Sequence, residues 1–440
     1  MIVSSDKVVK LKKHEDSMAY EQNIDNCFED KIGNNGLSRD EFEKNLVKAS
    51  DILDKLRREK DEGNSPIFNH IEQADDIENI IRIGSQIRDS FDELVVLGTG
   101  GSTLNPQSMV CLAQPHDGID KRVYFIDSVD PYTIESFIAQ LDLEGTAFLV
   151  TSKSGSTVET LAQFMCFLDA LEKEHLDIGK HIYIISDPVD NPLRDIGKQI
   201  GATVIDHEKN IGGRFSTFTN VGLIPAVVAG VDIRKIRKFA KAAVEAFFKS
   251  NSIPVQGAAL QYSFMQKGTA ATVIMPYVDR LSAVATWYRQ IWAESLGKQG
   301  KGNTPIKAIG ALDQHSQLQL YLDGPKDKLF NLITCDTEKK GLKISGNYLN
   351  NDTRYLKGKN IGDVNAALQK ATAETLARNN CPLRHIKFGN MNEETLSTIM
   401  VHFMLETIIT AHLLELNPFD QPAVEEGKVF ARQILNDSRA

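Results

Sequence analysis

The sequence predicts an α/β fold with two halves, each built on a mostly parallel sheet that helices cover on both faces. A recurring sequence pattern predicts the fold class, and the length of the chain allows more than one domain. Short apolar runs recur along the chain, and each is followed by a turn rich in Gly, Ser, Thr or Asp and then by a segment with helical periodicity. This alternation is typical of parallel sheets, whose strands are buried on both faces. At 440 residues the chain is long enough for two or three domains.

The N-terminal part of the chain differs from the rest. It is charged, favours helix and lacks runs of β-branched residues, so we predict a helical segment over residues 1–90. Short apolar runs then begin. The predicted strands of the first α/β half lie at 94–97, 123–126, 147–150, 182–185 and 202–205.

A long helical pattern at 233–248 separates these strands from a second set. The predicted strands of the second half, separated by helices, lie at 271–275, 305–309, 329–333 and 383–388. We therefore predict one α/β domain over residues 91–230 and another over residues 231–440, which ends in a C-terminal helix.

Composition and charge narrow the class of ligand. Lys and Arg total 50 against 59 Asp and Glu, which gives a net charge of −9, and the sequence has no basic stripe. Nucleic acid is therefore not an expected partner, because it requires an extended positive surface. An anionic small molecule remains a candidate, since a few local donors can make a cleft positive.

Cysteine usage and the longest apolar stretch bear on the compartment. The five cysteines are odd in number, widely spaced and without a C-x-x-C pair, which predicts neither a disulfide framework nor a metal site. No apolar stretch follows the N-terminal lysines, so no signal peptide is predicted. The apolar pattern at Met391–Leu416 contains His402, Glu406 and His412, which makes a membrane span costly. We predict a cytoplasmic protein without a membrane partner, and we interpret His402 and Glu406 as structural.

Residues 147–161 have the pattern of a buried strand, a hydroxyl-rich turn and the start of a helix. Such a turn directs free backbone N–H groups and the positive end of a helix dipole at one spot, which suits a phosphate. The candidate hydroxyl donors are Ser152, Ser154, Thr157 and Thr160. Ser156 and Glu159 also have the spacing of a capping box, which would only start the helix, so the pattern alone leaves both interpretations open.

Two glycine turns are further candidates. Gly98–Ser102 follows a strand, and its glycines let the backbone approach a ligand, although Thr103 stands where a dinucleotide fingerprint has its third glycine. A tight strand-to-helix turn is the alternative. Arg214 follows Gly212 and Gly213, where a guanidinium could stabilise an oxyanion or a phosphate; an ordinary ion-paired arginine is the alternative.

Three titratable residues carry weaker signals. Glu294 lies off the apolar face of a predicted helix at 281–297, and Lys298 four positions later would form a routine helix salt bridge with it. His315 follows a predicted strand among polar neighbours, where an imidazole could act as an acid or a base. Lys428 lies in the C-terminal helix, and a solvated lysine is the alternative there.

Taken in order, these segments resemble the glucose-6-phosphate isomerase family, also called phosphoglucose isomerase, from Leu94 to Lys428. The blocks that carry the resemblance are Gly-Gly-Ser102, Ser-Lys-Ser-Gly-Ser-Thr157-Val-Glu-Thr160, Gly-Gly-Arg214, Glu-Ser-Leu-Gly-Lys298, Asp-Gln-His315 and Phe-Asp-Gln421-x-x-Val-Glu-x-x-Lys428. Six blocks in this order are highly specific for this family. The resemblance implies two three-layer α/β/α sugar-isomerase (SIS) domains.

The resemblance also implies an activity, the reversible isomerisation of glucose 6-phosphate and fructose 6-phosphate in glycolysis and gluconeogenesis. Glu294 matches the base that moves a proton between C2 and C1 through a cis-enediol, and Arg214 matches the arginine that faces the enediolate. His315 and Lys428 match the groups that open and close the sugar ring. The residues that match substrate and phosphate contacts are Gly101, Ser102, Ser152, Ser154, Thr157, Thr160 and Gln421. The resemblance implies no cofactor and no metal.

A homodimer, in which His315 reaches the neighbouring active site, is a further implication of the resemblance. The sequence departs from the family's usual G-I-G-G-S-x-L-G-P at Thr99 and Asn105. It also departs at Ala423, which replaces the glycine of D-Q-x-G-V-E and adds a methyl group close to Gln421. We expect none of these changes to touch a catalytic group.

Two other functions fit the same motifs. A phosphoglucose/phosphomannose isomerase of broader specificity would also accept mannose 6-phosphate. A non-catalytic SIS protein would only bind a sugar phosphate. Glu294, His315 and Lys428 favour an enzyme over a binding protein, because binding alone does not require an acid or a base.

Overall fold

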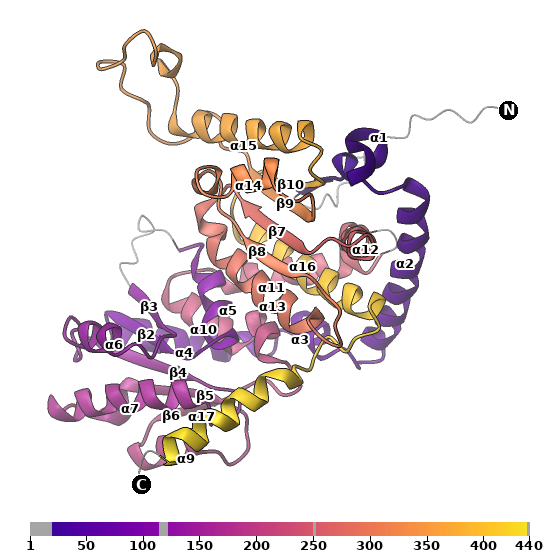
Figure 1. Cartoon of the computed structure of the whole chain (residues 1–440). Helices are drawn as coiled ribbons and strands as arrows, with labels where there is room; N and C mark the ends of the chain where they lie inside the picture. The colour runs from indigo at the N-terminus through magenta and orange to yellow at the C-terminus, as the bar shows by residue number, and fades with distance from the viewer. Residues whose placement is uncertain (1–19, 114–121, 250–251, 438–440) are drawn as a thin grey trace.

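The structure is a computed structural model that describes residues 20–113, 122–249 and 252–437. Figure 1 shows two lobes, each with its own sheet, and helices packed around and between them. Each sheet has five strands.

The sheet of the first lobe is wholly parallel, in the order β3-β2-β4-β5-β6. Its strands are β2 (Glu93–Leu97), β3 (Arg122–Ile126), β4 (Thr146–Thr151), β5 (Ile182–Ser186) and β6 (Thr203–Asp206). The connecting helices are α5 (Gly101–Val110), α6 (Pro131–Ile138), α7 (Val158–Lys173), α8 (Ile178–His181) and α9 (Pro192–Ile200). Strands β4 and β5 are buried along their whole length, as expected for strands covered on both faces.

The sheet of the second lobe has the order β1-β10-β9-β7-β8. Its parallel strands are β7 (Ala271–Pro276), β8 (Thr304–Lys307), β9 (Lys328–Cys335) and β10 (Leu383–Phe388), and β1 (Tyr20–Asn23) pairs antiparallel with β10. The helices that follow these parallel strands in the chain are α13 (Ser282–Leu296), α14 (Leu318–Asp323), α15 (Ile361–Arg378) and α16 (Glu393–Leu413). A final helix, α17 (Glu425–Asp437), extends along the first lobe.

The predicted fold class is confirmed, and all nine predicted strands are present close to their predicted positions. One strand was missed, because β1 lies in the segment predicted to be helical. It has only four residues, too few for a strand pattern, and Tyr20 is the one that is buried. The rest of the described segment is helical, with α1 (Glu29–Ile32), α2 (Arg39–Asp61), α3 (Pro66–Glu72) and α4 (Ile77–Ser90). Residues 1–19 lie outside the described residues.

One apolar core runs through both lobes. It includes Leu94 and Leu149 from the first sheet and Ile274 from the second. Three helices join these groups, namely α10 (Asn220–Val228), α11 (Ile233–Phe247) and α12 (Ile253–Gln266). The predicted boundaries after residues 90 and 230 fall between helices or strands, while the division of the chain into separate domains stays a prediction.

Helix α16 is apolar and long enough to cross a membrane by length and composition. In the structure, however, 94% of its apolar stretch is buried inside the protein, where the helix packs against α11, α12 and α13. Its apolar character is therefore that of a core helix.

His402 and Glu406 on α16 belong to a buried ionic cluster with Arg384 of β10. Arg384 Nη2 donates to Glu406 Oε2 at 2.6 Å, and His402 Nε2 lies 2.8 Å from the same oxygen. Burial raises the pKa of Glu406, but the charge of Arg384 and the contact with His402 outweigh it and hold the pKa at about 2. This cluster connects the second sheet to the core helix, in agreement with the structural interpretation of both residues.

Candidate active site

The hydroxyl-rich turn between β4 and α7 has the geometry of an anion-binding loop. Ser152 Oγ and Thr157 Oγ1 lie 2.9 Å apart across it. The side chain of the N-cap residue, Thr157, forms no cap bond to the first turn of α7 within the described structure, so free N–H groups of this helix face the turn. The hydroxyl of Thr160 is buried and has no hydrogen-bond partner among the described residues. Backbone and side-chain donors are therefore available to an anion at this point.

The capping-box interpretation of Ser156 and Glu159 is wrong. The N-cap residue of α7 is Thr157, one position later, and it forms no side-chain cap bond. Ser156 instead donates its hydroxyl to Ser154 Oγ at 3.2 Å. The cause is the turn itself, in which Gly155 has a φ of +63° and keeps Ser156 outside the helix.

The turn Gly98–Ser102 packs against the loop that carries Arg214. A Cβ on Gly101 would lie 2.3 Å from Gly213 O and 2.9 Å from Arg214 N, so this approach requires glycine. Ser102 is the second residue of α5 and is partly exposed. The two glycine turns of the sequence therefore form one structural unit.

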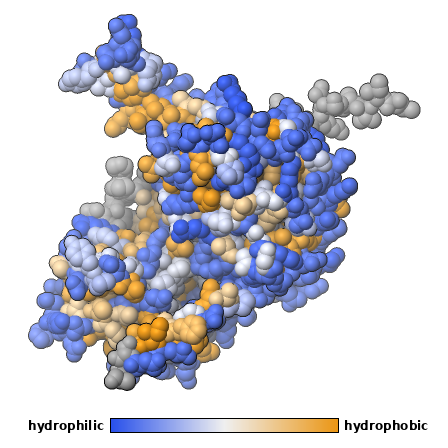
Figure 2. Space-filling model, in the orientation of Figure 1, coloured by the Kyte–Doolittle hydropathy of each residue, from blue (hydrophilic) through white to orange (hydrophobic). Residues whose placement is uncertain are grey.

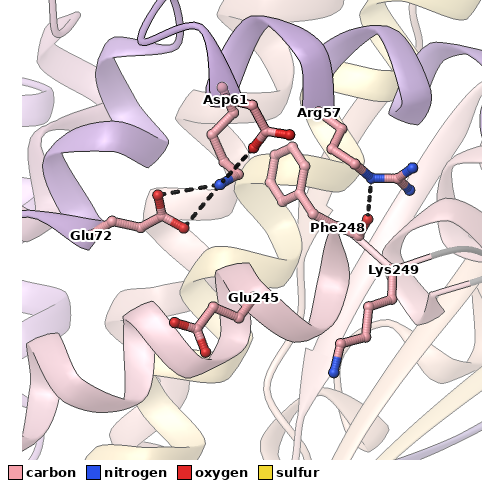
Figure 3. Close-up of a pocket in the computed structure, with 7 residues that line it drawn as sticks. Arg57, Asp61, Glu72, Glu245, Phe248 and Lys249 are labelled. Carbon is pink, nitrogen blue, oxygen red and sulfur yellow. Dashed lines mark hydrogen bonds and ion pairs between the residues drawn. The ribbon is translucent and has the colours of Figure 1, made fainter.

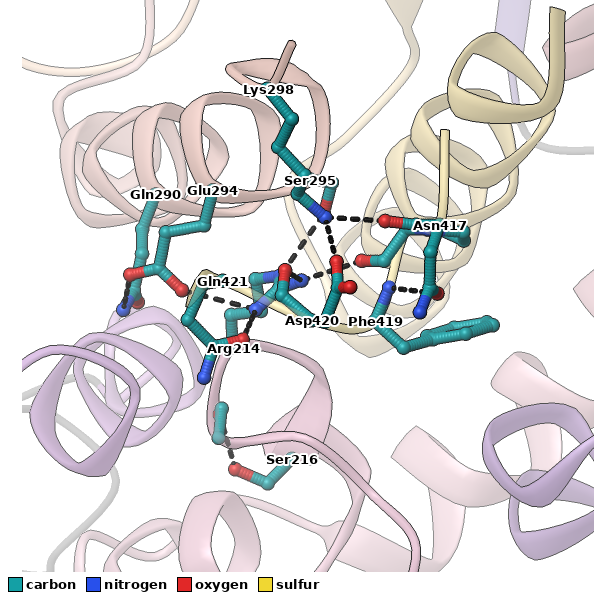
Figure 4. A network of polar contacts seen from close by, with 12 residues as sticks. Arg214, Ser216, Gln290, Glu294, Ser295, Lys298, Asn417, Phe419, Asp420 and Gln421 are labelled. Atoms are coloured by element: carbon teal, nitrogen blue, oxygen red, sulfur yellow. Dashed lines mark hydrogen bonds and ion pairs between the residues drawn. The ribbon is translucent and has the colours of Figure 1, made fainter. Parts of the chain in front are cut away.

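Arg214 is the centre of a buried polar network (Figure 4). Its side chain connects the 3-10 helix Gly213–Phe218 with α13 and with the loop after α16. Its acceptors are Ser295 Oγ (3.0 Å), Glu294 Oε2 (3.1 Å), Gln421 Oε1 (2.8 Å), Pro418 O (2.5 Å) and Asp420 O (3.2 Å). Burial lowers the pKa of Arg214, and Glu294 partly offsets this effect. The guanidinium stays charged because arginine is too strong a base to lose its proton in a protein.

Glu294 presents a carboxylate at the edge of this network. Its Oε2 accepts from Arg214, and its Oε1 accepts from Gln290 Nε2 at 2.9 Å. Gln290 in turn lies against Gly100, where a Cβ would be 2.8 Å from Nε2. The Glu294 side chain is 30% exposed, whereas that of Arg214 is 2% exposed. A held, accessible carboxylate beside a buried cation can take up and return a proton.

Lys298 does not pair with Glu294, although the helix spacing allowed it. Its Nζ lies 2.6 Å from Asp420 Oδ1 and also donates to Asn417 O. The hydrogen bond from Lys298 lowers the pKa of Asp420. This pair fixes the loop that brings Gln421 to Arg214. Gln421 and Arg214 are in contact although Ala423 stands where the family pattern has glycine.

His315 lies apart from this network. It follows the 3-10 helix Leu312–Gln314 and is exposed. Within the described part of the chain, no hydrogen bond or ion pair joins it to Arg214 or Glu294.

Lys428 is also exposed, and its Nζ lies 2.7 Å from Glu425 Oε1 on the same helix. Helix α17 contacts the turn between β4 and α7 through Arg432, whose Nη2 donates to Ser156 O at 3.0 Å. Lys428 lies four residues before Arg432, so the helix that carries it borders the turn.

Two polar residues of the site were missed by the sequence analysis. Gln290 holds Glu294, and its position four residues earlier on the same helix was a usable signal. Lys153 lies within the turn between β4 and α7, and its Nζ donates to Ile211 O at 2.8 Å. Lys153 thereby connects this turn to the loop that leads to Arg214.

Other parts of the structure are weaker candidates for a functional site. Among the described residues, no group of three or more His, Cys, Asp or Glu side chains could hold a metal ion. A surface pocket of about 510 Å³ between α2, α3 and α11 contains none of the predicted site residues (Figure 3). Several of its charges are already paired, for example Lys60 with Glu72 at 3.0 Å. The candidate active site is therefore the network around Arg214.

Comparison with known proteins identifies the family. Residues 66–440 match the phosphoglucose isomerase family. The chain belongs to this family. The assignment made from the six sequence blocks is thus confirmed.

Curated members of the phosphoglucose isomerase family are similar to the chain over most of its length. The probable glucose-6-phosphate isomerase of Methanococcus maripaludis is 32% identical over 429 residues, which cover 94% of each chain. The glucose-6-phosphate isomerase of Rubrobacter xylanophilus is 34% identical over 365 residues, which cover 80% of this chain and 84% of the relative.

Solved structures agree with this assignment. A hypothetical protein from Thermus thermophilus has a TM-score of 0.82 at 31% identity, over 90% of this chain and 98% of that one. A glucose-6-phosphate isomerase from Chlamydia trachomatis has a TM-score of 0.69 at 23% identity, over 82% of this chain and 74% of that one. The second similarity shows the shared fold.

Proposed function

We propose that the protein interconverts glucose 6-phosphate and fructose 6-phosphate, as an aldose–ketose isomerase of glycolysis and gluconeogenesis. The observation that carries the proposal is the pair of Glu294 and Arg214, with a partly exposed carboxylate held by a buried guanidinium. Membership of the phosphoglucose isomerase family, whose curated members above are named glucose-6-phosphate isomerases, supports the choice of substrate.

In the proposed mechanism, Glu294 is the catalytic base. With the aldose open, the carboxylate takes the proton from C2, and the C1 carbonyl becomes an enediolate as the C1–C2 double bond forms. The hydroxyl proton on the C2 oxygen moves to the C1 oxygen, Glu294 returns its proton to C1, and the C2 oxygen becomes the carbonyl of the ketose. Arg214 stabilises the negative charge on the enediolate, since a fixed cation in a buried position needs no reorganisation.

The turn between β4 and α7 binds the phosphate in this proposal, through Ser152, Ser154, Thr157 and Thr160. Its free helix N–H groups and the unpaired hydroxyl of Thr160 support the assignment. Gly101, Ser102 and Gln421 complete the substrate contacts. Binding the phosphate away from C1 and C2 supplies orientation that the reacting carbons cannot supply themselves.

His315 and Lys428 open and close the sugar ring in the proposed mechanism. Both are exposed in the single chain, which suits residues that meet substrate or a second subunit. We propose a homodimer in which His315 enters the neighbouring site. Apolar surface is visible on both lobes (Figure 2). The large hydrophobic side chains that are exposed in the single chain include Tyr348, Val429 and Phe430.

We place the enzyme in the cytoplasm. The five cysteines are free, as expected in a reducing compartment. Sugar phosphates of this kind are small anions, and the proposed site needs only the local cation of Arg214 to accept them despite the net charge of −9.

A coupled assay on the purified protein tests the proposal. We expect formation of glucose 6-phosphate from fructose 6-phosphate, unchanged by a chelator. Mannose 6-phosphate is assayed in parallel, and its rapid conversion would contradict the glucose/fructose assignment. A protein that binds fructose 6-phosphate without converting it would contradict the enzymatic role.

A further inference from the structure

We infer that Asn105 is a positioning residue that sets the location of Arg214 relative to Glu294; the inference rests on the proposed function. Asn105 lies in α5 and is fully buried. It stands at a position where the resembled family pattern has glycine, so its side chain adds an interaction that the pattern lacks.

The Asn105 amide bridges the two glycine turns of the site. Its Nδ2 donates to Gly101 O at 2.5 Å and to Gly213 O at 2.6 Å. An amide nitrogen carries two hydrogens, so these two carbonyls match its donor capacity. Gly101 and Gly213 belong to the two turns that pack closely enough to exclude a Cβ on Gly101. The amide therefore joins them by direct hydrogen bonds.

The orientation of the amide is fixed by a third partner. Thr217 donates its hydroxyl to Asn105 Oδ1 at 2.5 Å, and this directs Nδ2 toward the carbonyls. Ser216 Oγ lies 3.1 Å from Nδ2 and itself donates to Gly213 O at 2.6 Å. Asn105, Ser216 and Thr217 are all buried, so water cannot replace these bonds.

Gly213 directly precedes Arg214, so the position of its carbonyl determines where the arginine side chain begins. The Arg214 carbonyl is held on the other side by Trp287 Nε1 at 3.0 Å. Trp287 belongs to α13, the helix that also carries Glu294. Asn105 and Trp287 thus fix the Arg214 backbone between α5 and α13, and the buried guanidinium follows this backbone toward Glu294.

The proposed role requires a side chain at position 105 that donates hydrogen bonds. An aspartate at this position has the same size but, when ionised, no hydrogen to donate, so it would direct an anionic oxygen at two carbonyls. The smaller Asn105→Gly variant removes both bonds without adding repulsion and restores the residue of the family pattern. A purely space-filling role would tolerate the aspartate better than the glycine, whereas a donor role predicts the reverse.

The test compares Asn105→Asp and Asn105→Gly with the wild-type protein, in fructose 6-phosphate kinetics and thermal unfolding. We expect Asn105→Asp to lower kcat by ~10- to 100-fold and to change KM by less than about threefold, because a small displacement of a transition-state group acts on kcat. Asn105→Gly should have a smaller effect on kcat. The control is Asn45→Ala, which removes another buried amide bond, to Ser263 Oγ at 2.8 Å, without a change in kcat.

Two further measurements separate positioning from general stability. In an Arg214→Ala background, Asn105→Gly should lower kcat no further, because the group that it positions is gone; an equal loss in both backgrounds would overturn the inference. A crystal structure of Asn105→Gly should show the Arg214 Nη1–Glu294 Oε2 distance changed from 3.1 Å. An unchanged distance would also overturn it. The crystal structure requires no activity, so a wild-type protein without isomerase activity would count against the proposed function alone.

Discussion

The substitution Glu294→Gln gives the sharpest test of the proposed mechanism, because it removes the proposed base and disturbs little else in the structure. The amide keeps the size of the carboxylate and can still accept from Arg214 Nη1. On the other side, the new NH₂ group meets Gln290, whose Oε1 has no partner among the described residues and can turn to accept. Arg214 also keeps its four other acceptors, so no buried charge is left alone.

The expected loss of activity follows from the lost proton transfer. A positioned general base contributes roughly 10²- to 10⁴-fold, so we expect kcat to fall by about 10³-fold. This corresponds to about 4 kcal/mol in the activation free energy, at about 1.4 kcal/mol for each factor of ten. The melting temperature and KM should stay close to wild type, because the variant keeps the packing and the phosphate contacts.

The coupled assay with fructose 6-phosphate measures kcat and KM, and calorimetry confirms folding. A matched control is Glu78→Gln, which alters another carboxylate paired with arginine, Glu78 with Arg234 at 2.7 Å, on the surface away from the site. This control should retain full activity. A folded Glu294→Gln enzyme with kcat within threefold of wild type would refute the assignment of the base.

Three other predictions concern the turn between β4 and α7, the glycine contact and the buried ionic cluster. Thr157→Val should raise KM for fructose 6-phosphate by about tenfold or more, since a hydrogen bond to a charged group contributes about 1.5–3 kcal/mol, and an unchanged KM would exclude Thr157 from the phosphate site. Gly101→Ala should lower the free energy of unfolding in urea by about 1–3 kcal/mol, because the new methyl meets the Gly213 backbone at 2.3 Å; wild-type stability would show that the two turns can separate. Glu406→Gln should cost about 3–5 kcal/mol at pH 7 by leaving Arg384 unpaired. Because folding lowers the pKa of Glu406 from 4.5 to about 2, this difference should shrink as the pH falls from 4.5 toward 2, and a gap that grows on acidification would contradict the ion pair.

Much of the fold was predictable because its strands are apolar runs that parallel sheets bury on both faces. Leu94–Leu97 and Ile182–Ile185 are examples, and both lie within strands of the structure. β1 was not predictable in the same way. Its single buried residue, Tyr20, packs on Phe388 of β10, with ring centroids 4.9 Å apart. That contact joins residues far apart in the sequence, and no local pattern reports it.

The candidate site shows the same division between local and distant information. The sequence placed Ser152 and Thr157 in one turn, and the structure joins them through a hydrogen bond of 2.9 Å. The capping box failed because the pattern does not report the left-handed turn at Gly155, which delays the start of the helix by one residue. Spacing identified the correct segment but not its backbone conformation.

Glu294 shows why local periodicity underestimates a residue of the candidate site. Its position off the apolar face of α13 and the lysine four residues later both favour an ordinary solvated side chain. In the structure, that lysine pairs with Asp420 instead. Glu294 pairs with the guanidinium of Arg214, which lies 80 residues earlier in the chain. A carboxylate at a protein surface is common, whereas a buried arginine directed at it must be held by several acceptors to offset its desolvation. These acceptors come from α13 and from the loop at 418–421. Only the folded chain, or the order of the six blocks shared with the phosphoglucose isomerase family, therefore reveals that Glu294 differs from its exposed neighbours.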